Sequence, residues 1–175
     1  QEKLKGELPE LSLPTDRPRP ATETFNGDTY TRFLSSNLAN KLYEYCRKND
    51  VTVYMVVLAV FSILLHRYSR QEDILIASPI AGRNRVELEN LIGFFVNTLL
   101  MRNDLSGNPT FREYLERTKK QCFETYANQD VPFEEIVKKI QPERSLSKQS
   151  LFQVMLVLHN AESPDLVLPE MEVTS

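Results

Sequence analysis

A chain of 175 residues with 41% hydrophobic and 26% charged residues is long enough to bury the core of one globular domain. Its net charge of −3 excludes the general basic field of a nucleic-acid-binding protein, so no nucleic-acid partner is expected. The longest apolar run, 53–65, is too short to span a bilayer, and we expect neither a membrane partner nor a signal peptide.

The first 24 residues are predicted to be a linker. Proline fixes φ and removes a hydrogen-bond donor, and it disfavours helix in the residue before it. The run LPTDRPRP at 13–20 should therefore be extended, and by itself it is typical of a tether or a proline-rich peptide ligand. The prolines of this linker are Pro9, Pro14, Pro18 and Pro20.

Alternating helices and strands are predicted for the rest of the chain from hydrophobic periodicity and capping residues. Ser35 or Ser36, Thr52 and Thr110 should each cap a helix. Gly93 is expected to close a short one. The expected helices are 37–48, 53–68, 86–91, 111–127 and 132–140; the expected strands are 29–34, 74–80, 94–101, 151–158 and one beginning at 166–168.

This order of elements predicts an α/β fold with a mixed central sheet packed against helices. The helix at 53–68 is apolar nearly all round and should be buried. Cys46 and Cys122 fall in helices without CxxC spacing, which indicates free buried thiols in a reducing cytoplasm and no metal site.

The strand at 94–101 is apolar on both faces, so we expect a central strand that is covered on two sides. Asn97 is its polar exception, and a buried amide must find hydrogen-bond partners. It either ties two strands together as a satisfied core residue, the favoured interpretation, or faces a substrate channel.

Few side chains suggest catalysis. His66 and His159 have no spacing to a Cys, Asp or second His that would suit a metal or a catalytic triad. The carboxylate pairs Glu87/Glu89 and Glu134/Glu135 are typical of solvated helix faces.

Two loops carry the remaining candidates. Ser78 and Arg83 lie where a strand ends, a common place for sites in α/β sheets, although an ordinary turn explains them equally. Gln129 and Asp130 precede a helix, and capping by Asp130 would explain that pair without any function.

Three ordered motifs nevertheless resemble a known family. IGFFVNTLLMR at 92–102, NQDVPFE at 128–134 and the stretch 144–155 are similar to signatures of non-ribosomal peptide synthetase condensation domains. The resemblance covers 13–173 and only the C-terminal half of that domain. At 144–152 the family form R-D-x-S-R-N-P-L-F is replaced by RSLSKQSLF, which loses the Asp, the second Arg, the Asn and the Pro.

The resemblance implies a fold similar to chloramphenicol acetyltransferase, in which two lobes enclose the substrates. It implies an interlobe linker at 1–24, a C-terminal lobe at 25–175 and an N-terminal lobe absent from this chain. The catalytic HHxxxDG motif of the family belongs to that other lobe and occurs nowhere here, so no catalytic residue is expected in this chain. The residues expected to line the substrate tunnel or lobe interface are Asn97, Ser78, Arg83, Gln129 and Asp130.

The activity implied by the resemblance is peptide-bond formation in the biosynthesis of peptide antibiotics and other secondary metabolites. A donor thioester and an acceptor amine would both be presented on 4'-phosphopantetheine of upstream and downstream peptidyl carrier domains, next to an adenylation domain. No cofactor or metal is expected to bind directly, and the chain alone should be inactive. Two alternatives remain: a non-catalytic lobe that binds carrier domains or acts as a scaffold, and an acyltransferase that uses coenzyme A thioesters.

Overall fold

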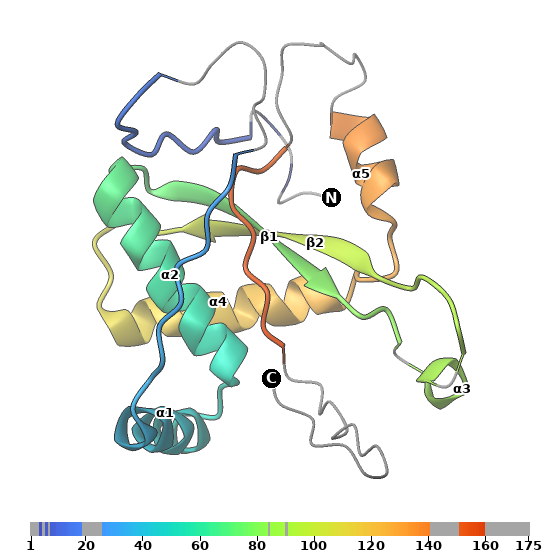
Figure 1. Ribbon diagram of the computed structural model, residues 1–175, viewed down its shortest axis with the longest axis horizontal. Helices are drawn as coiled ribbons and strands as arrows, with labels where there is room; N and C mark the ends of the chain where they lie inside the picture. The colour runs from blue at the N-terminus through green and yellow to red at the C-terminus, as the bar shows by residue number, and fades with distance from the viewer. Residues whose placement is uncertain are drawn as a thin grey trace, which may run out of the picture.

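The computed structural model describes residues 4, 6, 8–18, 26–83, 85–89, 91–140 and 151–159. The chain folds into helices on both faces of a small sheet (Figure 1). The elements in chain order are α1 Ser36–Lys48, α2 Val53–Ser69, β1 Asp73–Ile80, α3 Val86–Glu89, β2 Asn97–Asp104, α4 Phe111–Tyr126 and α5 Phe133–Ile140.

Three helix starts follow the predicted caps. The hydroxyls of Ser35 and Thr52 accept hydrogen bonds from the third residues of α1 and α2. Thr110 and Glu113 form a reciprocal capping box at the start of α4. These local interactions explain why the sequence places the beginnings of α1, α2 and α4 correctly.

The described sheet has two antiparallel strands, and one isolated parallel bridge joins a further segment to it. β1 and β2 pair antiparallel with Asp73 opposite Asp104 and Ile80 opposite Asn97. On the other edge of β1, Ala77 forms one parallel bridge with Met155. Hydrogen bonds from Ala77 N to Val154 O and from Leu156 N to Ala77 O hold that segment in place. β1 is therefore the middle element of the described sheet, and the prediction that 94–101 is its central strand is wrong.

Strand β2 also begins later than predicted. Phe94 and Val96 lie outside it and are exposed, because β1 ends opposite Asn97 and leaves the preceding residues without a strand to pair with. From Leu99 to Met101 the strand is buried on both faces, as expected.

Other local predictions fail for similar reasons. Residues 29–34 form no strand, since no neighbouring strand of the described residues pairs with them. The predicted strand 151–158 makes only the single bridge to Ala77. α3 ends at Glu89, and Gly93 does not have the positive φ of a helix C-cap. The strand predicted at 166–168 lies outside the described residues.

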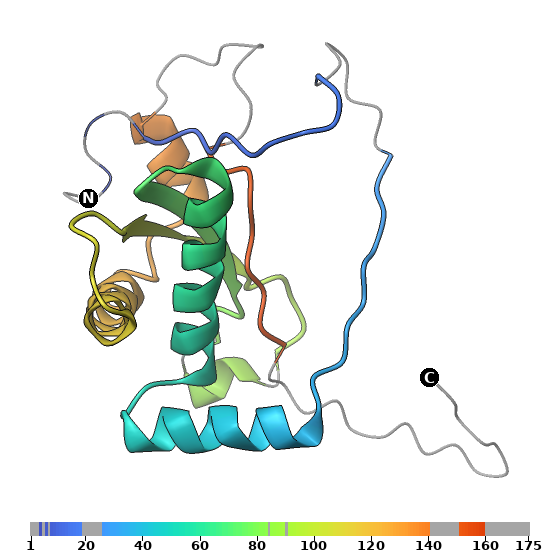
Figure 2. The ribbon, with the colours of Figure 1, turned by 90° about the vertical axis from the view of Figure 1, so that its left-hand side faces the viewer.

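The two faces of the sheet have separate cores. Ile76 and Met101 pack with α2 and α4 in the larger core, while Leu75 and Leu100 pack with α5 in the smaller one. Figure 2 shows α4 and α2 on one side of the strands, with α1 across the end of α2. Cys46 and Cys122 are buried and free, as predicted.

Helix α2 is not buried on all sides. Val60, Leu64 and Tyr68 are 53%, 49% and 63% exposed, respectively. Their spacing of four residues places them on one face, which α1, α4 and the sheet leave uncovered. The expectation of an entirely buried helix is wrong for this face.

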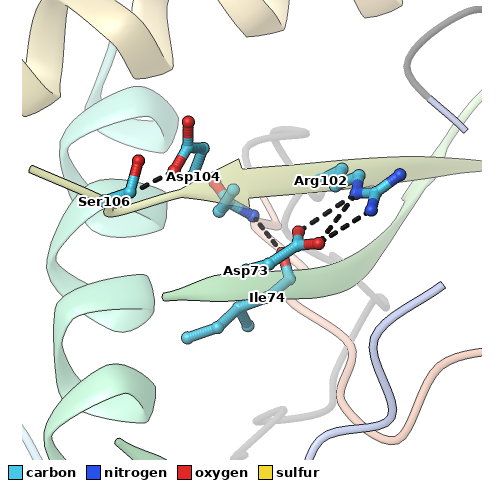
Figure 3. A network of polar contacts seen from close by, with 6 residues as sticks. Asp73, Ile74, Arg102, Asp104 and Ser106 are labelled. Carbon is cyan, nitrogen blue, oxygen red and sulfur yellow. Dashed lines mark hydrogen bonds and ion pairs between the residues drawn. The ribbon is translucent and has the colours of Figure 1, made fainter. Parts of the chain in front are cut away.

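Polar groups join the strands where β1 begins and β2 ends (Figure 3). The Arg102 guanidinium donates to both carboxylate oxygens of Asp73, with 2.8 Å from Nη2 to Oδ2. Asp104 accepts from the Ser106 backbone N–H at 2.9 Å. Hydrogen bonds from the Ser106 side chain and backbone hold the pKa of the Asp104 carboxyl below its usual value.

An Asp104→Asn variant should therefore lose stability in a pH-dependent way. A folded-state pKa below the unfolded value of about 3.9 gives stability that is present above that value and lost as pH falls through the folded pKa. We expect the urea midpoint of the variant to be lower than that of the unaltered chain at about pH 7 and to converge with it at acidic pH, as the pH falls through the folded-state pKa of Asp104. Asp16→Asn, at an exposed position outside this network, is the control. An equal loss at both pH values would contradict the assignment.

Candidate functional site

Three of the predicted site residues lie at one end of the β1–β2 ladder. Asn97 begins β2 opposite the last residue of β1, Ile80. Ser78 pairs with Leu99 two positions further along, and Arg83 follows the end of β1. The turn that carries Gln129 and Asp130 joins this group through Asn97, so the structure brings the candidates into one region.

Asn97 connects β2 to the start of α5. Its Nδ2 donates to Gln129 O at 2.7 Å and to Val131 O at 2.8 Å. Its Oδ1 accepts from Phe133 N at 3.0 Å and from Thr98 N at 2.9 Å. The amide is fully hydrogen bonded, as the favoured interpretation required, although it joins a strand to a helix start rather than to a second strand.

The start of α5 is consequently capped by a residue that is distant in the sequence. Helix α5 begins at Phe133, and Asn97 Oδ1 satisfies the N–H of that first residue. Asp130 lies exposed in the preceding turn, too early to be the N-cap residue, so the prediction that it caps this helix is wrong. Gln129 takes part through its backbone carbonyl, while its side chain is half-buried.

Ser78 is buried, at 3% exposure, and its Oγ donates to Leu156 O at 3.0 Å. This bond adds to the two backbone hydrogen bonds at Ala77. The hydroxyl thus anchors the 151–159 segment to β1.

Arg83 supports the connection between the two strands. We call residues 81–96, of which 84 and 90 are not described, the arch. The Arg83 guanidinium lies 4.4 Å from the centroid of the Phe95 ring, a cation–π contact. It also donates to Leu88 O and, at 3.3 Å, to Gly93 O. The Arg83 side chain, near the start of the arch, therefore contacts residues in its middle and near its end. The sequence did not indicate these contacts.

The outer surface of the arch is apolar. Ile92 is fully exposed and Phe94 is 89% exposed, and Val86 and Leu91 nearby are exposed as well. Figure 1 shows α3 and this connection projecting from the body beyond the end of the ladder. An exposed apolar cluster of this kind is typical of a surface that another protein segment covers. This surface was not expected from the sequence, because Phe94 fits a buried strand and Val86 and Leu91 fit a short helix.

Groups with catalytic chemistry are not concentrated in this region. Burial raises the pKa of the Cys122 thiol to about 11 and that of Tyr54 to about 12, so both remain protonated at neutral pH. His66 Nδ1 is 2.8 Å from Gln71 O, and His159 is exposed. The described residues contain no group of three metal-ligating side chains.

In the described part of the chain no single helix is long and apolar enough to cross a membrane. Helices α1 and α2 reach that length and hydropathy only together, and they meet at 107°.

Comparison with known proteins identifies relatives of this fold and sequence. A family model described as "Condensation domain" matches residues 1–173. One of the linear gramicidin synthase subunits of Brevibacillus parabrevis is 56% identical over 160 residues, which is 91% of this chain and 3% of that protein. The chain thus spans a small part of the curated relatives it matches.

Solved structures of related proteins superpose on this chain. A four-domain nonribosomal peptide synthetase bound to AMP and glycine superposes with a TM-score of 0.78 at 29% identity, over 83% of this chain and 11% of that chain. A complex of the X-domain and OxyB from teicoplanin biosynthesis gives a TM-score of 0.78 at 31% identity, over 88% of this chain and 34% of the matched one.

Proposed function

Because this chain belongs to the condensation-domain family, we propose that it is the C-terminal lobe of a domain that forms peptide bonds in non-ribosomal peptide synthesis. Residues 1–24 would be the interlobe linker and residues 25–175 the lobe itself. The observation that carries this proposal is the family match across residues 1–173. The identity of 56% to a protein of linear gramicidin synthase supports it.

The proposed reaction is acyl transfer from a thioester to an amine. The amine nitrogen attacks the thioester carbonyl, a C–N bond forms, the C–S bond breaks, and the thiolate takes up the proton that the amine loses. General-base help would come from a histidine of the HHxxxDG motif in a separate N-terminal lobe. This lobe would contribute by holding the two reactants in a productive orientation.

The five candidate residues have indirect roles in this proposal. The polar groups of Asn97 and Ser78 already bind other parts of the chain, and Arg83 braces the arch. They would set the shape of the tunnel wall at the end of the ladder, without binding substrate themselves. Gln129 and Asp130 lie in the turn that Asn97 holds, so this turn would form the adjoining part of the wall.

The proposed partners are the N-terminal lobe, upstream and downstream peptidyl carrier domains and an adjacent adenylation domain, all in the cytoplasm. The carrier domains would bring the substrates on 4'-phosphopantetheine arms, and the lobe would bind no cofactor of its own. The exposed apolar outer surface of the arch, with Ile92 and Phe94, is consistent with a surface that the other lobe covers.

A complementation assay tests this function. This chain is mixed with a separately made N-terminal lobe that carries HHxxxDG and with donor- and acceptor-loaded carrier domains. Dipeptidyl thioester is then measured by mass spectrometry. We expect product only when both lobes are present, and none when the second histidine of the motif is replaced by alanine. Product from this chain alone would overturn the proposed division of roles.

A binding or scaffold lobe is the second candidate. It is favoured by the likeness to an X-domain that has been solved in complex with OxyB. On this alternative the two lobes would associate, and a carrier domain would bind to the pair, but no dipeptidyl thioester would form. The same mixture therefore separates the two functions when binding is measured beside product formation.

A further inference from the structure

The proline-rich N-terminal segment is attached to the body by specific contacts. We call residues 8–13 the strap. Leu11 is only 8% exposed and belongs to the larger core, while Leu8 packs against the smaller one. The strap thus reaches both cores. A linker without a docking site would not bury a leucine in this way.

Two glutamine side chains hold the backbone of the strap. Gln71 Oε1 accepts from Ser12 N at 2.8 Å, and Gln71 Nε2 donates to Glu10 O at 2.8 Å. Gln153 Oε1 accepts from Leu11 N at 2.9 Å. One backbone group in each of three successive residues is therefore hydrogen bonded to a primary amide, much as a neighbouring strand would bind an extended chain.

The two glutamines come from segments that are far apart in the sequence. Gln71 follows α2, where Arg70 adopts a left-handed conformation with φ of 59°, and the carbonyl of Gln71 lies 2.8 Å from His66 Nδ1. Gln153 lies on the segment that bridges to β1. In Figure 2 the N-terminal segment crosses the end of α2 near the start of the 151–159 segment. The strap consequently joins the α2–β1 turn to the 151–159 segment.

We propose that Gln71 and Gln153 form a two-amide clamp, a docking site whose occupant is the strap of this same chain. Docking gives Leu11 a buried position and ties the strap to the 151–159 segment, which occupies the edge of β1 that β2 leaves open. The clamp can open without unfolding the body, since its hydrogen bonds involve side chains at the periphery of the core. Resting on the proposed function, the strap is then the anchored part of the interlobe linker and limits how far the second lobe can move.

Hydrogen exchange measured by NMR on the whole chain tests the clamp. The backbone amides of Leu11 and Ser12 should exchange more slowly than their intrinsic rates, by about tenfold or more. Gln71→Ala and Gln153→Ala should each accelerate both amides, by a similar factor, because the strap docks as one unit. The amide of Leu115, in the middle of α4, should keep its rate. Gln129→Ala, which truncates a glutamine elsewhere, should leave the strap unchanged.

Three results would overturn the proposal. The first is exchange of Leu11 and Ser12 at intrinsic rates in the unaltered chain. The second is unchanged protection in both glutamine variants. The third is equal acceleration at Leu115, which would make the strap an inseparable part of the core. None of these readouts depends on peptide formation, so failure of the clamp is distinguishable from failure of the proposed function.

Discussion

Gly82→Ala should destabilise the chain more than substitution of its other described glycines with positive φ. Gly82 has φ of +67°, which by itself costs an alanine about 1 kcal/mol. A Cβ atom there would also overlap the Phe95 carbonyl oxygen, which is backbone and cannot turn aside. The backbone at Gly82 and at Phe95 would have to move apart to make room for the added methyl group. We therefore expect a loss of about 3 kcal/mol in the free energy of unfolding, measured by urea denaturation.

Gly107→Ala is the matched control for this prediction. Gly107 has φ of +81°, but an added Cβ would meet no atom within 4 Å. It should therefore lose only the conformational cost of about 1 kcal/mol. Equal losses of unfolding free energy at the two glycines would show that the close approach of Gly82 to Phe95 does not add to the cost of the substitution.

Asn97→Ala is expected to have the second large effect. The substitution removes four hydrogen bonds and leaves the N–H of Phe133 and the carbonyls of Gln129 and Val131 without this partner. Loss of a helix cap costs about 1 kcal/mol, and unsatisfied half-buried groups add to it. We expect a total loss of about 2–4 kcal/mol. Faster hydrogen exchange at the start of α5 should accompany it.

Two further variants identify the cause. Gln129→Ala retains the backbone carbonyl that Asn97 binds and should change stability by less than about 0.5 kcal/mol. Asn97→Asp keeps an acceptor for Phe133 N but places an oxygen against the carbonyls of Gln129 and Val131, so it should not restore stability. A stable Asn97→Ala chain that fails only in peptide formation would instead support direct contact with substrate.

Sequence reasoning succeeded where the determining interactions are local. Ser35, Thr52 and Thr110 each bond to a backbone N–H three residues ahead, so the caps can be read directly from the sequence. Strand limits depend on a partner elsewhere in the chain. Phe94 and Val96 have a strand-like sequence, but β1 ends before it reaches them. The same absence of a partner explains the missing strand at 29–34.

The candidate site was predictable in position but not in arrangement. Asn97 is conspicuous as a polar residue in an apolar run. Three of its four hydrogen-bond partners, however, lie 32 to 36 residues away, with no periodic pattern to reveal them. Arg83 was expected either to belong to an ordinary turn or to line the tunnel, and its stacking on Phe95 depends on the turn at Gly82. The clamp glutamines, Gln71 and Gln153, carry no signal in the sequence at all.

The contact between Leu11 and Gln153 also constrains the order in which the chain folds. These residues are separated by 142 positions, and the entropy cost of closing a loop rises with its length. Contacts of such separation form late, after local helices and the β1–β2 pair have shortened the effective loop. The strap is therefore synthesised well before Gln153 but is among the last parts of this lobe to dock. Until Gln153 is in place, the leucines of the strap stay accessible to chaperones and to other unfinished chains.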